Sequence, residues 1–435
     1  MLITQTDIKT FQKQLSEQSL KILSFWATYS PDPGDNGFWG ELNDQNQPVR
    51  GAKKGSVLNA RMLWSFATGY GSTKNEQYLK LADNAFTYYL HHFKDPQFGG
   101  AYWYVAPPGG LHNTQTTVLD PLGSKKQIYA QAFWIYALSA YYKVTQKQDA
   151  LLEAISLFNL IEKYSHDPKA GGYFEAFARD WSEINDQRLS SKDLNTAKTM
   201  NTHLHILEGY MALFQIWPDS QLKQQISHLL DCFDQYIIDP ATHHLRLFFD
   251  ADFKKPANAT GITLSFGHDI EAAWLLLEAA GIIQEPVYIA KMQLHCTDIA
   301  TAAMQGVDKD TGGLNYECQM DTDIPDASIM HAEKHWWVQA EALVGFLEAY
   351  LQSGQLVFYY RAAAVWQYIR RHLLSPTGEW LWGIDAQGDP MTGYYKIGFW
   401  KCPYHNLRAM IEAEKRLSII ADQLFNYSPH LDSTT

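Results

Sequence analysis

Aromatic, glycine-rich patches recur six times along this chain, and this repeat constrains its architecture more than any other feature. Successive patches start 61, 73, 73, 68 and 66 residues apart, so six units of about 70 residues account for nearly all 435 residues. A repeat of this length indicates that each unit is a supersecondary element that buries its apolar face only against its neighbours. The patches are GFWGEL at 37, FGGAYWYV at 98, GGYFEAFARD at 171, HLRLFFDAD at 244, GGLNYE at 312 and GEWLWGI at 378.

Each unit is predicted to contain a short β-hairpin followed by two helices. Glycines suit the turn of each patch, and alternating aromatic residues suit its strands. After each patch, apolar residues at helical spacing indicate a first helix, at 56–71, 125–146, 197–217, 268–281, 332–351 and 403–423. More charged stretches indicate second helices, at 75–93, 149–164, 219–237, 284–303 and 356–372, with 6–28 as the sixth.

The first helix of each pair is apolar almost all round, which is typical of a buried helix. The simplest closure places six inner helices inside six outer ones. The sequence therefore predicts an all-α fold, an (α/α)6 barrel over residues 1–435 in a single domain, with six short β-hairpins or loops at its mouth. An open α-solenoid is the alternative, but six units with divergent loops favour the closed form.

Polar or aromatic side chains interrupt the inner helices at matched positions. Their first members lie 68, 72, 67, 69 and 68 residues apart, so one group comes from near the start of each inner helix. Because a buried polar group is costly unless it is satisfied, six such groups at one mouth indicate a functional site rather than a core. The residues are Arg61, Tyr129 with Gln131, Asn201 with His205, His268 with Glu271, Trp337 with Glu341, and His405.

Histidine is the most informative residue type in this set. His205 shares a helix face with Asn201 four residues earlier, whereas His203 faces another way. Glu271 follows His268 by three residues, so its carboxylate is placed to orient that imidazole or to contact a substrate. A lone histidine is more often a core residue, but three at matched positions favour proton transfer near neutral pH, because the ordinary imidazole pKa is about 6.5.

Cofactor and metal motifs do not occur in the sequence. It contains no GxGxxG after a strand, no P-loop and no GxSxG. It also lacks the HExxH pattern of a helix-borne zinc site, although a divalent-metal isomerase stays open as an alternative use of the histidines. We therefore expect no cofactor and no metal.

Charge and cysteine usage exclude several classes of partner. A net charge of −12 disfavours nucleic acid and anionic membrane surfaces. No apolar run approaches the ~20 residues that span a bilayer, and the first residues do not resemble a secretory signal. The four cysteines form no CxxC motif and are expected to be free thiols in a reducing cytoplasm; they are Cys232, Cys296, Cys318 and Cys402.

Long stretches from all six units resemble the N-acylglucosamine 2-epimerase superfamily, and specifically its cellobiose 2-epimerase branch. The resemblance implies an (α/α)6 barrel that inverts C2 of a reducing-end glucose or mannose unit, without nucleotide or metal. Ring opening would precede two-histidine proton transfer through an enediolate. The stretches are KGSVLNARMLWSF (54–66), KKQIYAQAFWIYALSAYY (125–142), RLSSKDLNTAKTMNTHLHILEGY (188–210), FGHDIEAAWLLLEAA (266–280), KHWWVQAEALVGFLEAY (334–350) and GFWKCPYHNLRA (398–409).

The same resemblance implies roles for individual residues. His268 and His405 match the acid/base pair that works on opposite faces of C2, and His205 matches a third essential histidine. Trp400 matches a tryptophan that stacks on sugar. The other residues that match a substrate pocket are Arg61, Tyr129, Asn201, Glu271, Trp337 and Glu341.

One segment departs from the family pattern and several alternatives stay open. The segment VAPPGGLHNTQTTVLDPLGS at 105–124 is longer than expected and leaves open whether the substrate is a disaccharide or free mannose and glucose. An aldose–ketose isomerase, a glycoside hydrolase or lyase on the same barrel, and a non-catalytic sugar-binding protein are the alternatives. An inverting hydrolase needs two carboxylates about 6.5–9.5 Å apart, and Glu271 and Glu341 are the only ones at matched positions. The oligomeric state is not predicted.

Overall fold

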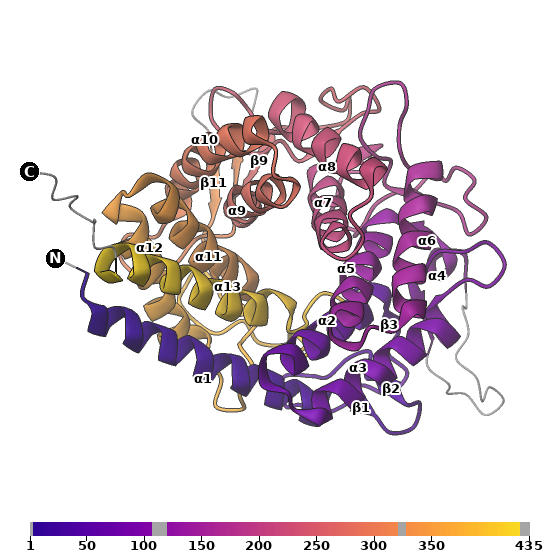
Figure 1. Cartoon of the computed structure of the whole chain (residues 1–435), viewed down its shortest axis with the longest axis horizontal. Helices are drawn as coiled ribbons and strands as arrows, with labels where there is room; N and C mark the ends of the chain where they lie inside the picture. The colour runs from indigo at the N-terminus through magenta and orange to yellow at the C-terminus, as the bar shows by residue number, and fades with distance from the viewer. Residues whose placement is uncertain (1–2, 107–119, 321–327, 427–435) are drawn as a thin grey trace, which may run out of the picture.

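The computed structural model describes residues 3–106, 120–320 and 328–426, and within them two concentric rings of helices dominate (Figure 1). The inner ring consists of α2 (Ser56–Thr73), α5 (Ile128–Thr145), α7 (Met200–Phe214), α9 (Phe266–Ile283), α11 (Trp336–Ser353) and α13 (Tyr404–Ala421). The outer ring consists of α1 (Gln5–Tyr29), α3 (Glu76–Tyr88), α6 (Gln148–Tyr164), α8 (Ser220–Cys232), α10 (Pro286–Ala303) and α12 (Leu356–Tyr368). A further short helix is α4 (Pro121–Ser124).

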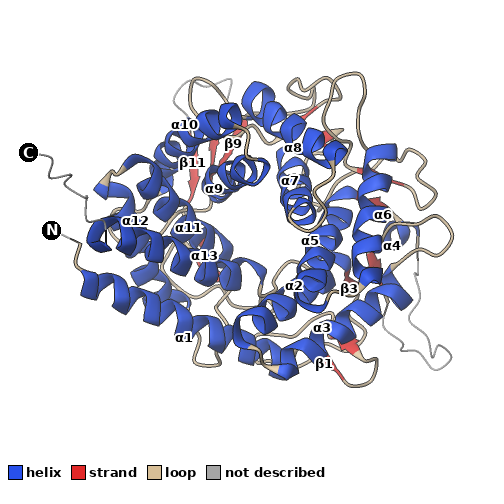
Figure 2. Cartoon of the chain, viewed as in Figure 1, coloured by secondary structure: helices blue, strands red, loops and turns tan. Residues whose placement is uncertain are grey.

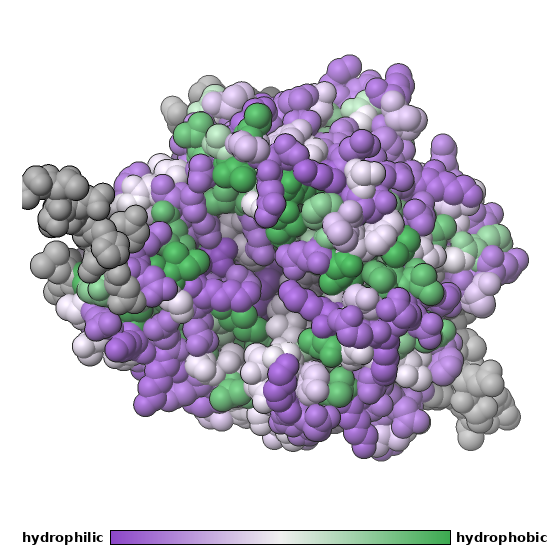
Figure 3. Space-filling view, viewed as in Figure 1, coloured by the Kyte–Doolittle hydropathy of each residue, from purple (hydrophilic) through white to green (hydrophobic). Residues whose placement is uncertain are grey.

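Each inner helix packs against the next one, and the ring closes where α13 contacts α2. The predicted all-α (α/α)6 barrel is therefore confirmed, and the open solenoid is wrong. Figure 2 shows how little of the chain is strand, and Figure 3 shows hydrophilic residues around the hollow near the middle of the face in view. Among the described residues, no helix is both long and apolar enough to span a bilayer.

The burial of each helix follows from its sequence pattern. In α5, every residue from 128 to 135 is buried, because the helix is enclosed by the outer ring on one side and by its inner neighbours on the others. In α8, by contrast, burial is confined to one apolar stripe that contains Leu222, Ile226 and Leu229. Asp219 caps the start of α8 by accepting backbone N–H groups from residues 221 and 222, which fixes where this helix begins.

The aromatic patches do not fold as the local hairpins that the sequence predicted. Instead, the strand before an inner helix pairs antiparallel with a strand about 50 residues later, in the following patch. These pairs are β3 (Lys54–Gly55) with β4 (Tyr104–Val105), β5 (Lys126–Gln127) with β6 (Ala176–Phe177), β7 (Lys198–Thr199) with β8 (Phe248–Phe249) and β12 (Lys334–His335) with β13 (Gly383–Ile384).

Within a patch the glycine turn forms only one isolated bridge, such as Lys94 with Ala101, so the next strand is free to join its neighbour. Local hairpins do occur at two places, one that includes the start of the first patch and one that begins at the end of the fifth. They are β1 (Pro31–Asp32) with β2 (Gly37–Phe38), and β10 (Glu317–Met320) with β11 (Ser328–His331), where β9 (Ile262–Ser265) adds a third strand to β10. The patches therefore join consecutive units at the N-terminal ends of the inner helices.

A buried lysine recurs just before five of the six inner helices. Lys126 binds Asp95 at 2.9 Å and Lys198 binds Asp167 at 2.7 Å, each across the boundary between two units. At the matched position before α9 the residue is Leu264. Because a buried charge needs a partner, each pair fixes a strand against the preceding turn. The remaining pairs are Lys54 with Asp32 and Asp35, Lys334 with Asp308, and Lys401 with Glu379.

A second matched set of polar residues serves the backbone rather than a substrate. Gln131 accepts a hydrogen bond from the Ala101 amide at 2.6 Å and donates one to the Ala101 carbonyl at 2.8 Å. Gln339 makes the same two bonds to Leu314, at 2.8 and 2.7 Å. His203 accepts from the backbone amide of residue 173, which confirms that it faces away from His205. Gln131, although grouped with Tyr129 in the sequence, is thus a structural residue.

Replacing Gln339 by leucine should destabilise the fold, because it leaves the buried amide and carbonyl of Leu314 without partners. We expect the free energy of unfolding, measured by urea titration, to fall by about 2–3 kcal/mol. The control is Gln355→Leu at an exposed position, where a change within about 0.5 kcal/mol is expected. Equal effects of the two substitutions would contradict this role for Gln339.

Candidate active site

A cavity of about 310 Å³ lies where the inner helices begin, and nine of the ten predicted site residues line it. In α7 and α11 the second and sixth residues face the barrel centre together, because side chains four apart share a helix face. Glu341 is the exception, since it lies behind the cavity wall. The nine residues are Arg61, Tyr129, Asn201, His205, His268, Glu271, Trp337, Trp400 and His405.

His405 is held by a buried carboxylate. Its Nδ1 lies 2.6 Å from Oε1 of Glu341 and 3.9 Å from Oε1 of Glu271. When Glu341 is ionised, Nδ1 carries the proton and donates it, so Nε2 is the unprotonated ring nitrogen. Glu341 also accepts a bond from the Trp274 indole N–H at 3.2 Å. Glu341, which we expected to contact the substrate, instead orients His405.

His205 is held in the same way by a residue that the sequence analysis missed. Its Nδ1 lies 2.9 Å from Oε2 of Glu208, three residues further along α7. The Tyr404 hydroxyl donates to the same carboxylate oxygen at 2.5 Å. The imidazole packs against the rings of Tyr129 and Phe133, with centroids 4.9 and 4.8 Å away. His205 therefore also has a fixed ring orientation.

His268 has a different partner from the one that its sequence neighbours suggested. Its Nδ1 lies 2.8 Å from the hydroxyl of Ser265, whereas Glu271 is bound by Arg408. Of the two roles expected for Glu271, orienting His268 does not agree with these contacts, and contact with a substrate stays a prediction. The His268 ring lies 4.8 Å from that of Trp337, which is 5.7 Å from the ring of His405, so one tryptophan contacts both proposed acid/base residues.

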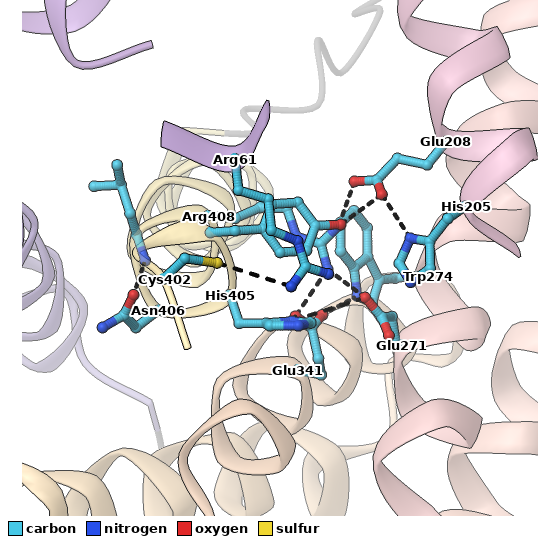
Figure 4. Close-up of polar contacts among 12 residues, drawn as sticks. Arg61, His205, Glu208, Glu271, Trp274, Glu341, Cys402, His405, Asn406 and Arg408 are labelled. Atoms are coloured by element: carbon cyan, nitrogen blue, oxygen red, sulfur yellow. Dashed lines mark hydrogen bonds and ion pairs between the residues drawn. The ribbon is translucent and has the colours of Figure 1, made fainter. Parts of the chain in front are cut away.

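Arg408, which was also not predicted from the sequence, joins these parts (Figure 4). One terminal nitrogen lies 2.5 Å from Glu271 and 2.8 Å from Glu341, and the other contacts Glu208 and the Tyr404 hydroxyl. The sequence contains a signal for both residues, because Arg408 follows His405 by three residues, as Glu208 follows His205.

Burial controls the protonation of the site. Burial lowers the pKa of all three histidines, and it lowers that of His268 to about 3. The charges of Arg61 and Arg408 lower the pKa of His405 further. Burial and the nearby Glu341 raise the pKa of Glu271 to about 8. For Glu208 the effect of burial is outweighed by Arg408 and His205, which lower its pKa to about 2. At neutral pH the imidazoles are thus uncharged, Glu208 is ionised and Glu271 is protonated.

Arg61 is a buried cation in the wall of the cavity. Its guanidinium donates to the Tyr129 hydroxyl at 3.0 Å and to the thiol of Cys402 at 3.8 Å. It also lies 4.2 Å over the ring of Phe133 and 4.3 Å over that of Tyr404. A rigidly held guanidinium beside the histidines can stabilise negative charge that develops on a bound molecule.

Several polar atoms in the cavity wall have no hydrogen-bond partner within the part of the chain that the structure describes. Buried groups of this kind are costly when unpaired, so their presence fits a ligand with many hydroxyl groups. Three of these residues, His335, Trp336 and Trp382, were not predicted from the sequence. The atoms are Nε of Arg61, Oδ1 of Asn201, Nε2 of His335, and the indole nitrogens of Trp336 and Trp382.

One group of potential metal ligands exists among the described residues, formed by Glu271, Glu341 and His405, whose ligand atoms lie within 4.8 Å of one another. The Arg408 guanidinium already binds the Oε1 atoms of both carboxylates, and His405 Nδ1 bonds to that of Glu341. A metal ion at this position would have to displace an arginine. The donor set therefore fits an ion-pair network better than a metal site.

The long segment at 105–124 is only partly described. Its residues 107–119 lie outside the described residues, so its effect on the cavity is not tested. At its end, Asp120 accepts a hydrogen bond from the Tyr104 hydroxyl at 2.6 Å and another from the backbone amide of Gly123 at 2.7 Å. These bonds fix the chain where it returns to the strand before α5.

Comparison with known proteins agrees with this geometry. The profile of the N-acylglucosamine 2-epimerase (GlcNAc 2-epimerase) family matches residues 37–409. The cellobiose 2-epimerase of Bacteroides fragilis is 40% identical over 92% of this chain and 97% of its own length. That of Dictyoglomus turgidum is 33% identical over 94% of this chain and all of its own.

A solved structure agrees with the sequence relatives. The cellobiose 2-epimerase of Spirochaeta thermophila superposes with a TM-score of 0.84 at 34% identity, covering 96% of this chain and 98% of that one. Together the barrel, the histidine-lined cavity and these matches establish that the chain belongs to the N-acylglucosamine 2-epimerase family of carbohydrate epimerases.

Proposed function

We propose that this protein is a cofactor-independent sugar 2-epimerase of the cellobiose 2-epimerase type, which inverts C2 of a reducing-end glucose or mannose unit. The observation that carries the proposal is that three neutral histidines line one cavity together with Arg61. Inversion beside a carbonyl needs one group to remove a proton and another to return it on the other face. The similarity to the cellobiose 2-epimerases, over nearly the whole chain, supports the same reaction.

The proposed reaction begins with ring opening, in which the proton of the C1 hydroxyl leaves and the ring oxygen gains one. His205 assists this step. One of His268 and His405 then takes the C2 proton on its Nε2, and the electrons of the C–H bond form an enediolate across C1 and C2. The other histidine takes up a proton from water and gives it to the opposite face of C2, the first histidine releases its proton to water, and the ring closes.

Residues of the cavity wall stabilise the negative charge of the enediolate in this scheme. Arg61 is placed to donate to the enediolate oxygens, where one preorganised donor is worth about 3–4 kcal/mol of transition-state energy. The protonated carboxyl of Glu271 and the amide of Asn201 bind sugar hydroxyls. Trp337 and Trp400 provide aromatic faces for the sugar ring.

Related reactions share parts of this scheme. An aldose–ketose isomerase uses the same enediolate but returns the proton to C1, and an enzyme for free mannose or glucose differs only in how much sugar it admits. A glycoside hydrolase is disfavoured, because Glu341 lies behind His405 and Glu271 shares an arginine with it. These carboxylates are not placed on opposite sides of a glycosidic bond.

We also propose that residues 1–435 act as one catalytic domain in the cytoplasm, with a small sugar as the substrate and without nucleic acid or a membrane as a partner. The four cysteines are free and buried, which suits a reducing compartment.

Incubation with cellobiose, lactose, glucose and mannose in D₂O tests the reaction class. We expect NMR to detect the 2-epimer of at least one sugar with deuterium at C2, because an acid/base histidine exchanges its proton with solvent. The yield should be unchanged by a chelator. Cleavage of the disaccharides, or a ketose as the sole product, would reject the proposal.

Substitution of His268 or His405 by alanine should lower kcat by at least about 10²–10⁴-fold, which is the usual contribution of a positioned acid or base. Circular dichroism checks that each variant is folded. The matched control is His203→Gln, in the same inner ring but bonded to backbone, which should change stability rather than kcat. Near-normal turnover by either alanine variant would remove that histidine from its role.

The pH dependence should reflect the buried environment. Because burial lowers the pKa of His268 and His405 below 6.5, the unprotonated bases persist in acid, and the acidic limb of kcat/KM should lie below pH 6.5. Above pH 8, where Glu271 loses its proton, kcat/KM should fall. Glu271→Gln should abolish that basic limb. An acidic limb centred at or above pH 6.5 would contradict the histidine assignment.

A further inference from the structure

Behind the sugar cavity lies a buried charge network that the reaction scheme does not use directly. Its centre is Arg408, which contacts the carboxylates of Glu208, Glu271 and Glu341 at once. Of these, Glu208 holds the Nδ1 of His205 and Glu341 holds that of His405. Two histidines from different inner helices, α7 and α13, are therefore connected through one guanidinium.

Arg408 is separated from the sugar by the residues that it binds. It does not line the cavity of about 310 Å³ that contains the histidines. Together with Glu208 and Trp274 it lines a different cavity, of about 680 Å³, on the other side of the network. Any effect of Arg408 on the reaction is therefore exerted through the side chains that it holds.

The geometry of the contact requires arginine. A planar guanidinium can bind several carboxylates with separate nitrogens in fixed directions, whereas a lysine ammonium is a single point charge on a flexible stem. Here one terminal nitrogen binds Glu271 and Glu341, while the other binds Glu208. Without this cation, the ionised carboxylates of Glu208 and Glu341 would be buried without an arginine partner, which is strongly destabilising.

We infer that Arg408 is a positioning residue, which fixes Glu208 and Glu341 so that His205 and His405 are both held with the proton on Nδ1 and with Nε2 free for the sugar. The inference rests on the proposed function and deepens it. His268, whose Nδ1 faces the hydroxyl of Ser265, lies outside this arrangement and keeps its tautomer independently of Arg408.

Arg408 also acts through its charge. Its positive charge is among the causes that lower the pKa of His205 and His405, after burial and Arg61. Arg408→Lys keeps the positive charge but loses the planar guanidinium, so it tests the geometry alone. Arg408→Met loses both, so its difference from Arg408→Lys shows the effect of the charge.

The test compares Arg408→Lys with Arg416→Lys. Arg416 lies two turns further along α13, is also buried and also binds two glutamates, Glu348 and Glu412, and neither Arg416 nor these glutamates line the cavity that contains the histidines. We expect kcat for epimerisation to fall at least 100-fold in Arg408→Lys, with KM within threefold of wild type. Arg416→Lys should change kcat less than threefold. Equal kcat values for the two variants would overturn the inference.

Arg408→Met should show a further effect, in the pH profile. Without the positive charge the pKa of His405 rises, so the acidic limb of kcat/KM should move to higher pH than in wild type or in Arg408→Lys. A limb that does not move would reject the electrostatic part. If neither Arg408 variant folds, Glu208→Gln tests the same connection for His205 alone.

A readout that does not depend on activity is the ¹⁵N NMR spectrum of protein labelled in histidine. In wild type, His205 and His405 should show the Nδ1–H tautomer. In Arg408→Lys both signals should change while that of His268 stays the same, and Glu208→Gln should change His205 only. Unchanged His205 and His405 signals would overturn the inference. The expected tautomers in a wild-type protein without epimerase activity would reject the proposed function and leave the positioning role intact.

Discussion

The barrel depends on satisfying polar groups that are buried where its inner helices begin. Lysines placed just before the inner helices would each be an uncompensated charge without the acid that meets them from the preceding turn. Lys126 with Asp95 and Lys198 with Asp167 are the clearest pairs, and each crosses from one unit to the next. These ion pairs occur before five of the six inner helices and, with the two-residue strand pairings beside four of them, set the height at which those helices start.

Because the start of each of these inner helices is fixed, the position of a residue along the helix determines whether its side chain supports the backbone or faces the cavity. Residues at the fourth position, such as Gln131 and Gln339, face the preceding turn and satisfy its backbone. Residues at the second and sixth positions, such as Asn201 and His205, face the barrel centre instead. About half a helical turn thus separates structural from chemical side chains, and six helices at one height bring the chemical ones together.

The same requirement for partners shapes the site itself. A buried imidazole is neutral, and its reactive nitrogen is defined only when the other nitrogen is held. Glu341 and Glu208 hold two of the rings and Ser265 holds the third. Two carboxylates so close to each other would repel, and Arg408 makes their proximity possible. The residues that touch the sugar are therefore supported by a layer of charges that does not touch it.

The sequence by itself determined the twelve helices of the two rings, their order and nine of the residues that line the cavity, because helical periodicity and a repeat of about 70 residues are local and regular signals. It could not determine which strands pair, since β3 and β4 lie some 50 residues apart and each is two residues long. Nor could spacing decide between Ser265 and Glu271 as the partner of His268, because both lie three residues away on the same chain. Only the tertiary structure decided this, by placing Arg408 from α13 between Glu271 and Glu341, where the attraction of a buried cation outweighs a local pairing within α9.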